Sequence, residues 1–208
     1  RPLVVDDAVD EAFVVDGGSM DGTVEFFESR GIRVIPQEIK GRGEAFRIGM
    51  REAKGANLVF FSPDGNEDPA DIPRLLSLLE EGYDMAIASR FMEGGRSDDA
   101  EELIAHRAFG NKLFTKVADL LWGGSLTDSI NGFRAIKKEK LEALRLDAHG
   151  FGIEFQMSIR ALKLGYRIRE ITTYEGDRIG GQSSAKALDT GLYFIRLILR
   201  ELRLGKNF

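Results

Sequence analysis

The segment "FFSPDGNEDP" carries an apolar run into a turn that is rich in oxygen-bearing side chains. Ser62, Asp64 and Asn66 offer a hydroxyl, a carboxylate and an amide at alternate positions of this turn. Oxygen atoms are the ligands that Mg²⁺ and Mn²⁺ prefer in proteins, and bound phosphates often complete their coordination. Asp-Gly is also a frequent turn dipeptide for reasons of backbone geometry alone. The segment therefore fits either a cation and phosphate site or a simple loop.

Two more charged side chains follow predicted strands in the first half of the chain. Asp16 ends the run "AFVVD", and Arg42 lies in "GRGEAF", after the strand predicted at residues 32–36. The carboxyl ends of parallel strands meet along one edge of a sheet, where ligands usually bind. Neighbouring glycines allow the backbone to approach a phosphate closely. Asp16, Arg42 and Asp64 could therefore hold a ribose, a diphosphate and a cation together.

Four arginines in the second half stand next to a predicted strand end, a helix start or a glycine: Arg90, Arg107, Arg134 and Arg178. A guanidinium binds phosphate through two parallel hydrogen bonds, so several arginines in one pocket would bind a phosphorylated acceptor. Each arginine taken alone also fits a solvated or salt-bridged surface position. The sequence lacks a nucleophile elbow, a Walker loop and a dinucleotide fingerprint, which argues against a hydrolase, an ATPase and a dinucleotide enzyme.

Alternating strands and helices are needed to bring these loops together. Short apolar runs predict the strands and amphipathic stretches the helices between them, a spacing typical of a mostly parallel sheet. The first half contains predicted strands at residues 12–16, 32–36, 57–62 and 83–90, and helices at 23–30, within 41–55 and at 68–82. The second half contains a helix at 103–122, a strand and turn at 125–138, a helix at 150–165, a strand at 166–178 and a last helix at 188–204.

Length and composition predict one globular domain over residues 1–208. Its nucleotide-binding part would cover about residues 1–95 and its acceptor-binding part about residues 96–208. The chain has no cysteine and only two histidines, so a metal would bind oxygen or imidazole ligands, and a hard cation such as Mg²⁺ or Mn²⁺ is favoured over a multi-histidine zinc site. The net charge of −5 argues against nucleic acid as a partner. No apolar run is long enough to span a membrane.

The last predicted helix combines a wide apolar stripe with three cations. Its sequence, "LDTGLYFIRLILRELRL", places Arg196, Arg200 and Arg203 between large apolar residues. Such a helix can dock on the protein core, on a partner or on lipid headgroups. Packing on the core or on a partner is the commoner use of such a stripe.

Six motifs in the same order resemble those of family 2 glycosyltransferases, closest to the polyprenyl- and dolichol-phosphate sugar transferases. They are "VVDGGSMDGT", "GRGEAFRIGM", "LVFFSPDGNEDPADIPRLL", "IASRF", "LTDSINGFRAIKKE" and "GFGIEFQMSIRALKLGYRIREI" with a later "GGQS". The resemblance runs from about Glu11 to Ser184. It implies the α/β fold called GT-A, in which helices flank a mostly parallel, Rossmann-like sheet. It also implies an inverting transfer of a hexose from a GDP- or UDP-sugar to a polyprenyl (dolichyl) phosphate, at the inner, cytoplasmic face of a membrane.

The resemblance also implies roles for individual residues. The nucleotide sugar would lie beside Asp16, Arg42, Asp64 and Arg90, and the catalytic residues would be Asp64 and Asp128. Mg²⁺ or Mn²⁺ would bind Ser62, Asp64 and Asn66. The acceptor phosphate would contact Arg107, Arg134, Arg178 and Ser183.

Three departures from the family pattern leave alternatives open. Residues 1–11 do not supply the opening strand that grips the base. Gly17 stands where a second acid is expected, and Ser62 replaces the first acid of the Asp-x-Asp element. Because the turn has lost half its charge, a catalytically impaired nucleotide-sugar-binding protein is the alternative to an active transferase. A different sugar-nucleotide enzyme is the third possibility.

Overall fold

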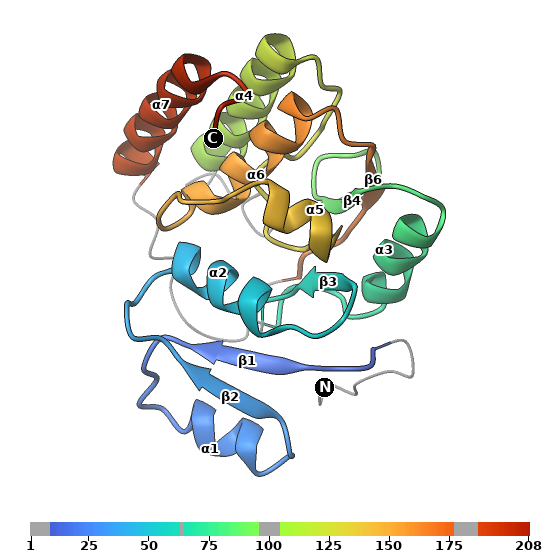
Figure 1. Ribbon diagram of the computed structural model, residues 1–208, viewed down its shortest axis with the longest axis vertical. Coiled ribbons are helices and arrows are strands. Elements are labelled where there is room, and N and C mark those ends of the chain that lie inside the picture. Colours follow the sequence, from blue (N-terminus) through green and yellow to red (C-terminus); the bar gives the residue numbers. More distant parts are fainter. Residues whose placement is uncertain (1–8, 63–64, 96–104, 177–186) are drawn as a thin grey trace.

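Strands and helices alternate along the chain in the predicted order, except for an unpredicted short helix at Lys138–Ala143 (Figure 1). The computed structural model describes residues 9–62, 65–95, 105–176 and 187–208. The strands are β1 (Phe13–Asp16), β2 (Arg33–Pro36), β3 (Asn57–Phe60), β4 (Met85–Ser89), β5 (Arg134–Lys137) and β6 (Ile168–Thr172). The helices are α1 (Thr23–Glu28), α2 (Arg42–Glu52), α3 (Asp71–Glu80), α4 (Ala105–Trp122), α5 (Lys138–Ala143), α6 (Gly152–Lys163) and α7 (Ala187–Leu204).

The described strands form two sheets. β1 and β2 pair in parallel, and the other four strands form a second sheet in the order β3-β5-β4-β6. β4 and β6 are parallel, whereas β5 runs antiparallel to both β3 and β4. The amino end of β5 therefore lies at the carboxyl edge of its neighbours, with Arg134 opposite both Phe60 and Ile87. This orientation brings the loop before β5 to the edge where the site was predicted.

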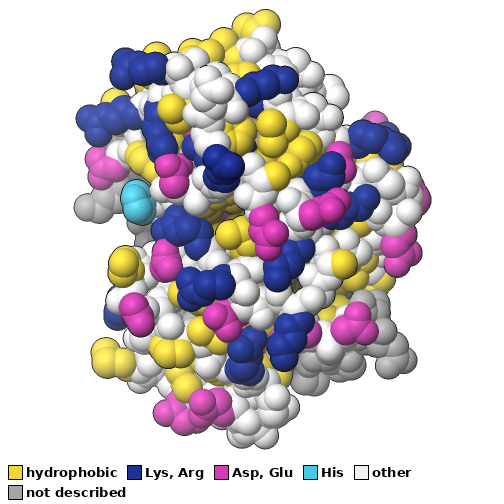
Figure 2. Space-filling model, in the orientation of Figure 1, with side chains coloured by type: hydrophobic (Ala, Val, Ile, Leu, Met, Phe, Trp, Pro, Cys, Tyr) yellow, Lys and Arg dark blue, Asp and Glu magenta, His cyan; other side chains and the backbone are white. Residues whose placement is uncertain are grey.

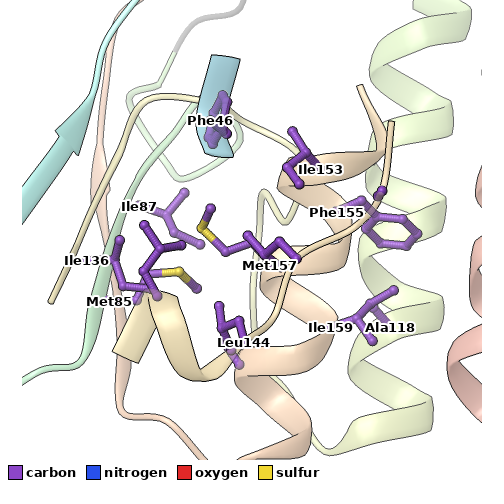
Figure 3. Close-up of a cluster of buried hydrophobic side chains, with 14 of the residues drawn as sticks. Phe46, Met85, Ile87, Ala118, Ile136, Leu144, Ile153, Phe155, Met157 and Ile159 are labelled. Atoms are coloured by element: carbon purple, nitrogen blue, oxygen red, sulfur yellow. The ribbon is translucent and has the colours of Figure 1, made fainter. Parts of the chain in front are cut away.

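The core lies on both faces of β4, whose five residues are all buried. Met85 and Ile87 point into a large cluster with side chains of α2, α4, α6 and α7 (Figure 3). Ala86 and Ala88 point to the opposite face, where they pack with Leu75 and other residues of α3. Successive side chains of a strand alternate between its two faces, so a strand covered on both sides reads as a continuous apolar run.

Helix α6 is buried almost all round, because it lies between the sheet and the two helices α4 and α7 (Figure 1). Its buried side chains include five polar residues, Glu154, Gln156, Ser158, Arg160 and Lys163. The ion-pair partners of Glu154, Arg160 and Lys163 lie on other elements of the fold. Within the ranges that the structure describes, no helix is long and apolar enough to cross a membrane.

Candidate functional site

Asp16 lies at the carboxyl end of β1, and its carboxylate is bonded within its own loop. It accepts hydrogen bonds from the backbone N–H groups of Gly18 and Ser19, at 2.7 and 2.9 Å, and from Ser19 Oγ at 2.5 Å. These bonds hold the pKa of Asp16 below its ordinary value, and the bond from the Ser19 hydroxyl has the largest effect. Asp16 is therefore ionised near pH 7, and it shapes the loop that was predicted to lie beside a nucleoside.

The loops after β1 and β2 meet in front of α2. Gln37 Oε1 accepts a hydrogen bond from the Gly41 N–H at 2.8 Å. Gly18 has a φ of 92°, and a Cβ atom on it would stand 2.9 Å from Lys40 Nζ. A residue with a side chain would be strained at this φ and would displace the lysine. The two glycine-rich loops thus place Lys40 beside the loop of Asp16 and lead the chain directly into Arg42.

Arg42 begins α2 and forms an ion pair with Glu154 in the first turn of α6. The Arg42 side chain is 34% exposed, whereas that of Glu154 is 2% exposed. Gly132 makes room for this guanidinium, because a Cβ atom at Gly132 would overlap Arg42 Nη2. A buried carboxylate thus orients an arginine that remains accessible from solvent.

Glu154 also has an unsatisfied oxygen. Its Oε1 atom is paired with Arg42, but its Oε2 atom is buried and has no hydrogen-bond partner among the residues that the structure describes. A buried acceptor without a partner costs about 1–3 kcal/mol, and more when it is charged. The first turn of a helix stabilises a carboxylate through the backbone dipole, which offsets part of that cost. Sequence reasoning missed Glu154, and its place at a helix start was the only local signal.

Arg90 and Asp128 form a bidentate pair at the carboxyl end of β4. Arg90 Nε donates to Asp128 Oδ2 at 2.7 Å, and Arg90 Nη2 donates to Asp128 Oδ1 at 3.1 Å. Glu175 approaches the same guanidinium at 3.8 Å. The side chains of Arg90, Asp128 and Glu175 are 10%, 0% and 5% exposed. The prediction placed Arg90 and Asp128 in one site, and the structure brings them into contact.

Glu170 on β6 holds the loop that carries Asp128. Glu170 Oε1 accepts the Asp128 N–H at 2.8 Å, and Oε2 accepts the Thr127 N–H at 2.8 Å and the Thr127 hydroxyl at 2.9 Å. Burial raises the pKa of Glu170 despite these bonds. Glu170 was not predicted as a site residue. Its contacts join segments 42 and 43 residues apart, which no local pattern indicates.

Arg134 lies beneath this loop and is completely buried. Its guanidinium donates to the backbone oxygens of Ser129, Asn131 and Glu154 and to Ser158 Oγ. Burial lowers the pKa of Arg134 to about 10, so it remains charged near pH 7. An acceptor phosphate could reach this guanidinium only if the packing around it opened. The described geometry therefore gives Arg134 a supporting position under the site.

The turn after β3 is tied to the loop after β6. The Ser62 N–H donates to Glu67 Oε2 at 2.6 Å, and the Gly176 N–H donates to the Asn66 carbonyl oxygen at 2.8 Å. Asn66 is 6% exposed, and its Oδ1 atom is buried without a hydrogen-bond partner in the described part of the chain. An unsatisfied amide oxygen fits the predicted role of Asn66 as a cation ligand. Among the described residues, no group of three His, Cys, Asp or Glu side chains could hold a metal ion.

Four predicted site residues cannot be placed in full. Asp64, Arg178 and Ser183 lie outside the described residues, and Arg107 lies in α4 at a position whose side chain is not described. Their roles stay predictions.

The described part of the site forms a connected polar network. Arg42 is joined through Glu154 to Arg134, and the Asn131 carbonyl links Arg134 to the loop of Asp128. Asp128 completes the connection to Arg90. The Arg90 and Arg134 side chains of this network are almost or completely buried, whereas that of Arg42 is 34% exposed and can meet a ligand phosphate. Asp16 stands apart from the network, in its own hydrogen-bonded loop.

Comparison with known proteins places the chain among enzymes that transfer sugars. A family model described as "Glycosyl transferase family 2" matches residues 5–145. Glycosyltransferase AglJ of Haloferax volcanii is 30% identical over 206 residues, an alignment that covers 95% of this chain and 66% of AglJ. The undecaprenyl-phosphate mannosyltransferase of Micrococcus luteus is 31% identical over 191 residues, which cover 85% of this chain and 77% of that enzyme. The chain thus spans about two thirds to three quarters of the length of these relatives.

A solved structure has the same architecture. Glucosyl-3-phosphoglycerate synthase of Mycobacterium tuberculosis, solved in complex with phosphoglyceric acid, aligns with a TM-score of 0.67 and 25% identity. The alignment covers 95% of this chain and 69% of that one. The predicted GT-A type of α/β fold is confirmed by this likeness.

Proposed function

Because the chain belongs to glycosyl transferase family 2, we propose that it transfers a hexose, with inversion, from a GDP- or UDP-sugar to a prenyl phosphate. The observation that carries this proposal is the 31% identity to an enzyme named undecaprenyl-phosphate mannosyltransferase, over 85% of the chain. A second relative, 29% identical, is named dolichyl-phosphate hexose transferase. The network around Arg42 and Arg90 supports it, because both substrates carry phosphate.

The donor would lie along the carboxyl edge of the strands. Asp16 would orient the nucleoside through its loop, and Arg42 would bind the diphosphate from its exposed side. Arg42 is suited to this task because Glu154 already holds its guanidinium in one direction. Binding a diphosphate to an oriented guanidinium loses less side-chain entropy than binding it to a mobile lysine.

The acceptor would approach from the second half of the chain. An oxygen of its phosphate would attack the anomeric carbon, and the bond between that carbon and the diphosphate would break. A phosphate monoester is already ionised near pH 7, so this step needs no strong general base. Asp128 would then act through Arg90, which it holds by two hydrogen bonds, rather than by accepting a proton. Arg107, Arg178 and Ser183 keep their predicted contacts with the acceptor phosphate in this proposal.

A divalent cation fits the turn after β3. Ser62, Asp64 and Asn66 would hold Mg²⁺ or Mn²⁺, and the unsatisfied Oδ1 atom of Asn66 supports this assignment. Such a cation often uses only one or two protein carboxylates, with the remaining ligands supplied by phosphates and water. When bound, it would offset the negative charge of the leaving diphosphate. The synthase with the similar fold has been solved with Mn²⁺ and uridine diphosphate.

The location follows from the acceptor. A prenyl phosphate keeps its chain in a bilayer and its phosphate at the surface. We therefore expect the protein to work as a peripheral protein at the inner, cytoplasmic face of the membrane.

The direct test is to incubate the protein with a panel of GDP- and UDP-hexoses, Mn²⁺ and a prenyl phosphate in detergent. The expected result is a glycosylated prenyl phosphate and a nucleoside diphosphate in equal amounts. Parallel reactions with phosphoglycerate, a soluble acceptor, would reveal transfer to a different phosphate. Donor binding without turnover in any reaction would favour the impaired binding protein, and release of pyrophosphate would identify a nucleotidyltransferase.

A further inference from the structure

Helices α4 and α7 expose an unusual number of large apolar side chains. On α4 these are Phe109, Leu113, Leu120 and Leu121, and on α7 they are Leu192, Ile195, Leu199 and Leu202. Each is at least 40% exposed, and Leu120 is 86% exposed. The two helices lie side by side, as the contact between the rings of Phe114 and Phe194 requires (Figure 1). We call these eight side chains the apolar face of α4 and α7.

The four α7 members of this apolar face lie on a different side of the helix from the residues that pack on the core. They recur every three or four residues, which places them along one stripe of the helix. Phe194, Leu197 and Ile198 lie on another stripe and belong to the hydrophobic core. The helix is therefore already anchored in the protein, and its second apolar stripe has no packing task among the described residues. Contiguous exposed apolar surface of this kind usually marks an interaction site.

The charges beside this face are almost all positive. The exposed cations are Lys112 and Lys116 on α4 and Arg196, Arg200 and Arg203 on α7. Some of them already have contacts: Arg200 pairs with Asp147, Lys116 stands 3.7 Å from Asp119, and Lys112 lies over the Phe91 ring. Among the described side chains of the two helices, Asp189 is the only exposed acid. Figure 2 shows Lys and Arg side chains next to hydrophobic ones at this end of the molecule.

We propose that the apolar face of α4 and α7 docks on a membrane surface that contains anionic lipids. Apolar side chains flanked by lysine and arginine bind a bilayer by burying the apolar groups at the level of the headgroups, where anionic lipids attract the cations. A second copy of this chain is a poorer partner, because a symmetric contact would bring the same cations against each other. The proposal rests on the proposed function, and it names the surface through which the protein reaches a membrane-bound acceptor.

Docking through this face would hold the site at a defined position relative to the membrane. The buried Glu201 of α7 binds Arg160 and Lys163 of α6, at 2.9 and 2.6 Å. The Tyr193 hydroxyl accepts the His149 N–H at 3.0 Å, just before α6 begins. Because α6 carries Glu154, the partner of Arg42, the docking helix is rigidly joined to an element of the site.

The test is flotation of the complete protein with vesicles of neutral phosphatidylcholine, and with vesicles that also contain anionic phosphatidylglycerol. The wild-type protein should bind the anionic vesicles at least about tenfold more tightly, and added salt should weaken the binding. Ile195→Glu with Leu199→Glu should weaken binding by about tenfold or more, because two charges replace apolar side chains that would enter the bilayer. Met20→Glu changes a side chain that is 99% exposed in the loop after β1, and should bind like the wild-type protein.

Thermal unfolding and the affinity for nucleoside diphosphate would show that the double variant folds and keeps its donor site. No binding to anionic vesicles, equal binding to neutral ones, or full binding by the double variant would overturn the proposal. The proposal would also be overturned if the wild-type protein formed dimers and the double variant only monomers. The apolar face would then bind a second copy of this chain. Failure of the proposed transfer would appear separately, in the reaction with a prenyl phosphate in detergent, which needs no vesicle.

Discussion

Gly43 in the first turn of α2 lies so close to Ala148 that a Cβ atom on it would stand 2.5 Å from the Ala148 carbonyl oxygen. The same carbonyl accepts a hydrogen bond from Arg47 at 2.9 Å. The loop before α6 therefore sets the position of α2, and with it the position of Arg42.

Gly43→Ala should push the start of α2 away from this loop. We expect a loss of about 1–3 kcal/mol in the free energy of unfolding and weaker binding of nucleoside diphosphate, because Arg42 shifts with the helix. Chemical denaturation and calorimetry measure the two effects. Gly49→Ala is a control on the same helix, since its Cβ atom would stand 3.4 Å from the Phe60 ring. If both variants bind diphosphate equally, Arg42 does not depend on this contact.

Asp128→Asn should be among the most damaging single substitutions in the site. It leaves the Arg90 guanidinium, which is 10% exposed, without its bidentate carboxylate. Breaking a buried ion pair from one side costs about 3–5 kcal/mol, which urea denaturation measures. Arg51→Ala breaks a pair with Glu52 whose side chains are 64% and 32% exposed, and should cost less than about 1 kcal/mol. A cost for Asp128→Asn as small as that of Arg51→Ala would contradict the importance of the buried pair.

Asn66→Ala separates a ligand role from a structural one. The Oδ1 atom of Asn66 has no hydrogen-bond partner within residues 9–62, 65–95, 105–176 and 187–208, so its removal should leave the melting temperature nearly unchanged. If Oδ1 binds the cation, Mn²⁺ should enhance the binding of nucleoside diphosphate less in the variant than in the wild-type protein. A large loss of stability together with unchanged Mn²⁺ enhancement would instead make Asn66 a structural residue.

Ser62→Asp restores a second carboxylate to the turn after β3. The added charge should strengthen Mn²⁺ binding in the presence of nucleoside diphosphate, and it should lower the melting temperature of the metal-free protein modestly through repulsion from nearby acids. One of these is Glu67, whose carboxylate accepts the Ser62 N–H. Isothermal calorimetry with and without Mn²⁺ checks the first effect. Unchanged Mn²⁺ affinity would mean that the turn does not hold the cation.

Glu201 should make the stability of the protein sensitive to acid. Burial opposes ionisation of this carboxyl, but hydrogen bonds from Arg160 and Lys163 outweigh it and hold the pKa below 4.5. The unfolded chain therefore takes up a proton first, so this stabilisation is complete well above pH 4.5 and is lost as the pH falls through the lowered value. Glu201→Gln should cost about 3–5 kcal/mol at pH 7, because two buried cations lose their partner. The difference from the wild-type protein should shrink below about pH 4.5, and a constant difference across that range would contradict the assignment.

The order of the elements could be predicted from sequence because it depends on local patterns. Continuous apolar runs between turns indicated β1 and β4, and the ends of these two strands are where Asp16 and Arg90 were expected. The short helix α5 was not predicted, since the expected strand and turn ended at residue 138 and six residues directly after a strand carry too little periodicity to be recognised. The antiparallel direction of β5 was also not predicted, since strand direction is set by the path of the chain through the fold.

The sequence by itself determined which residues carry charge at the ends of strands and the family to which their order belongs. Only the tertiary structure decided how those charges are paired. Arg42 meets Glu154 across 112 residues, and Arg90 meets Asp128 across 38, so no periodicity along the chain encodes either contact. Packing likewise buried Arg134 completely, although the sequence placed it, like Arg90, beside a strand end, a helix start or a glycine. A guanidinium binds whichever oxygen atoms the folded chain brings near it, and that choice depends on distances in space rather than along the sequence.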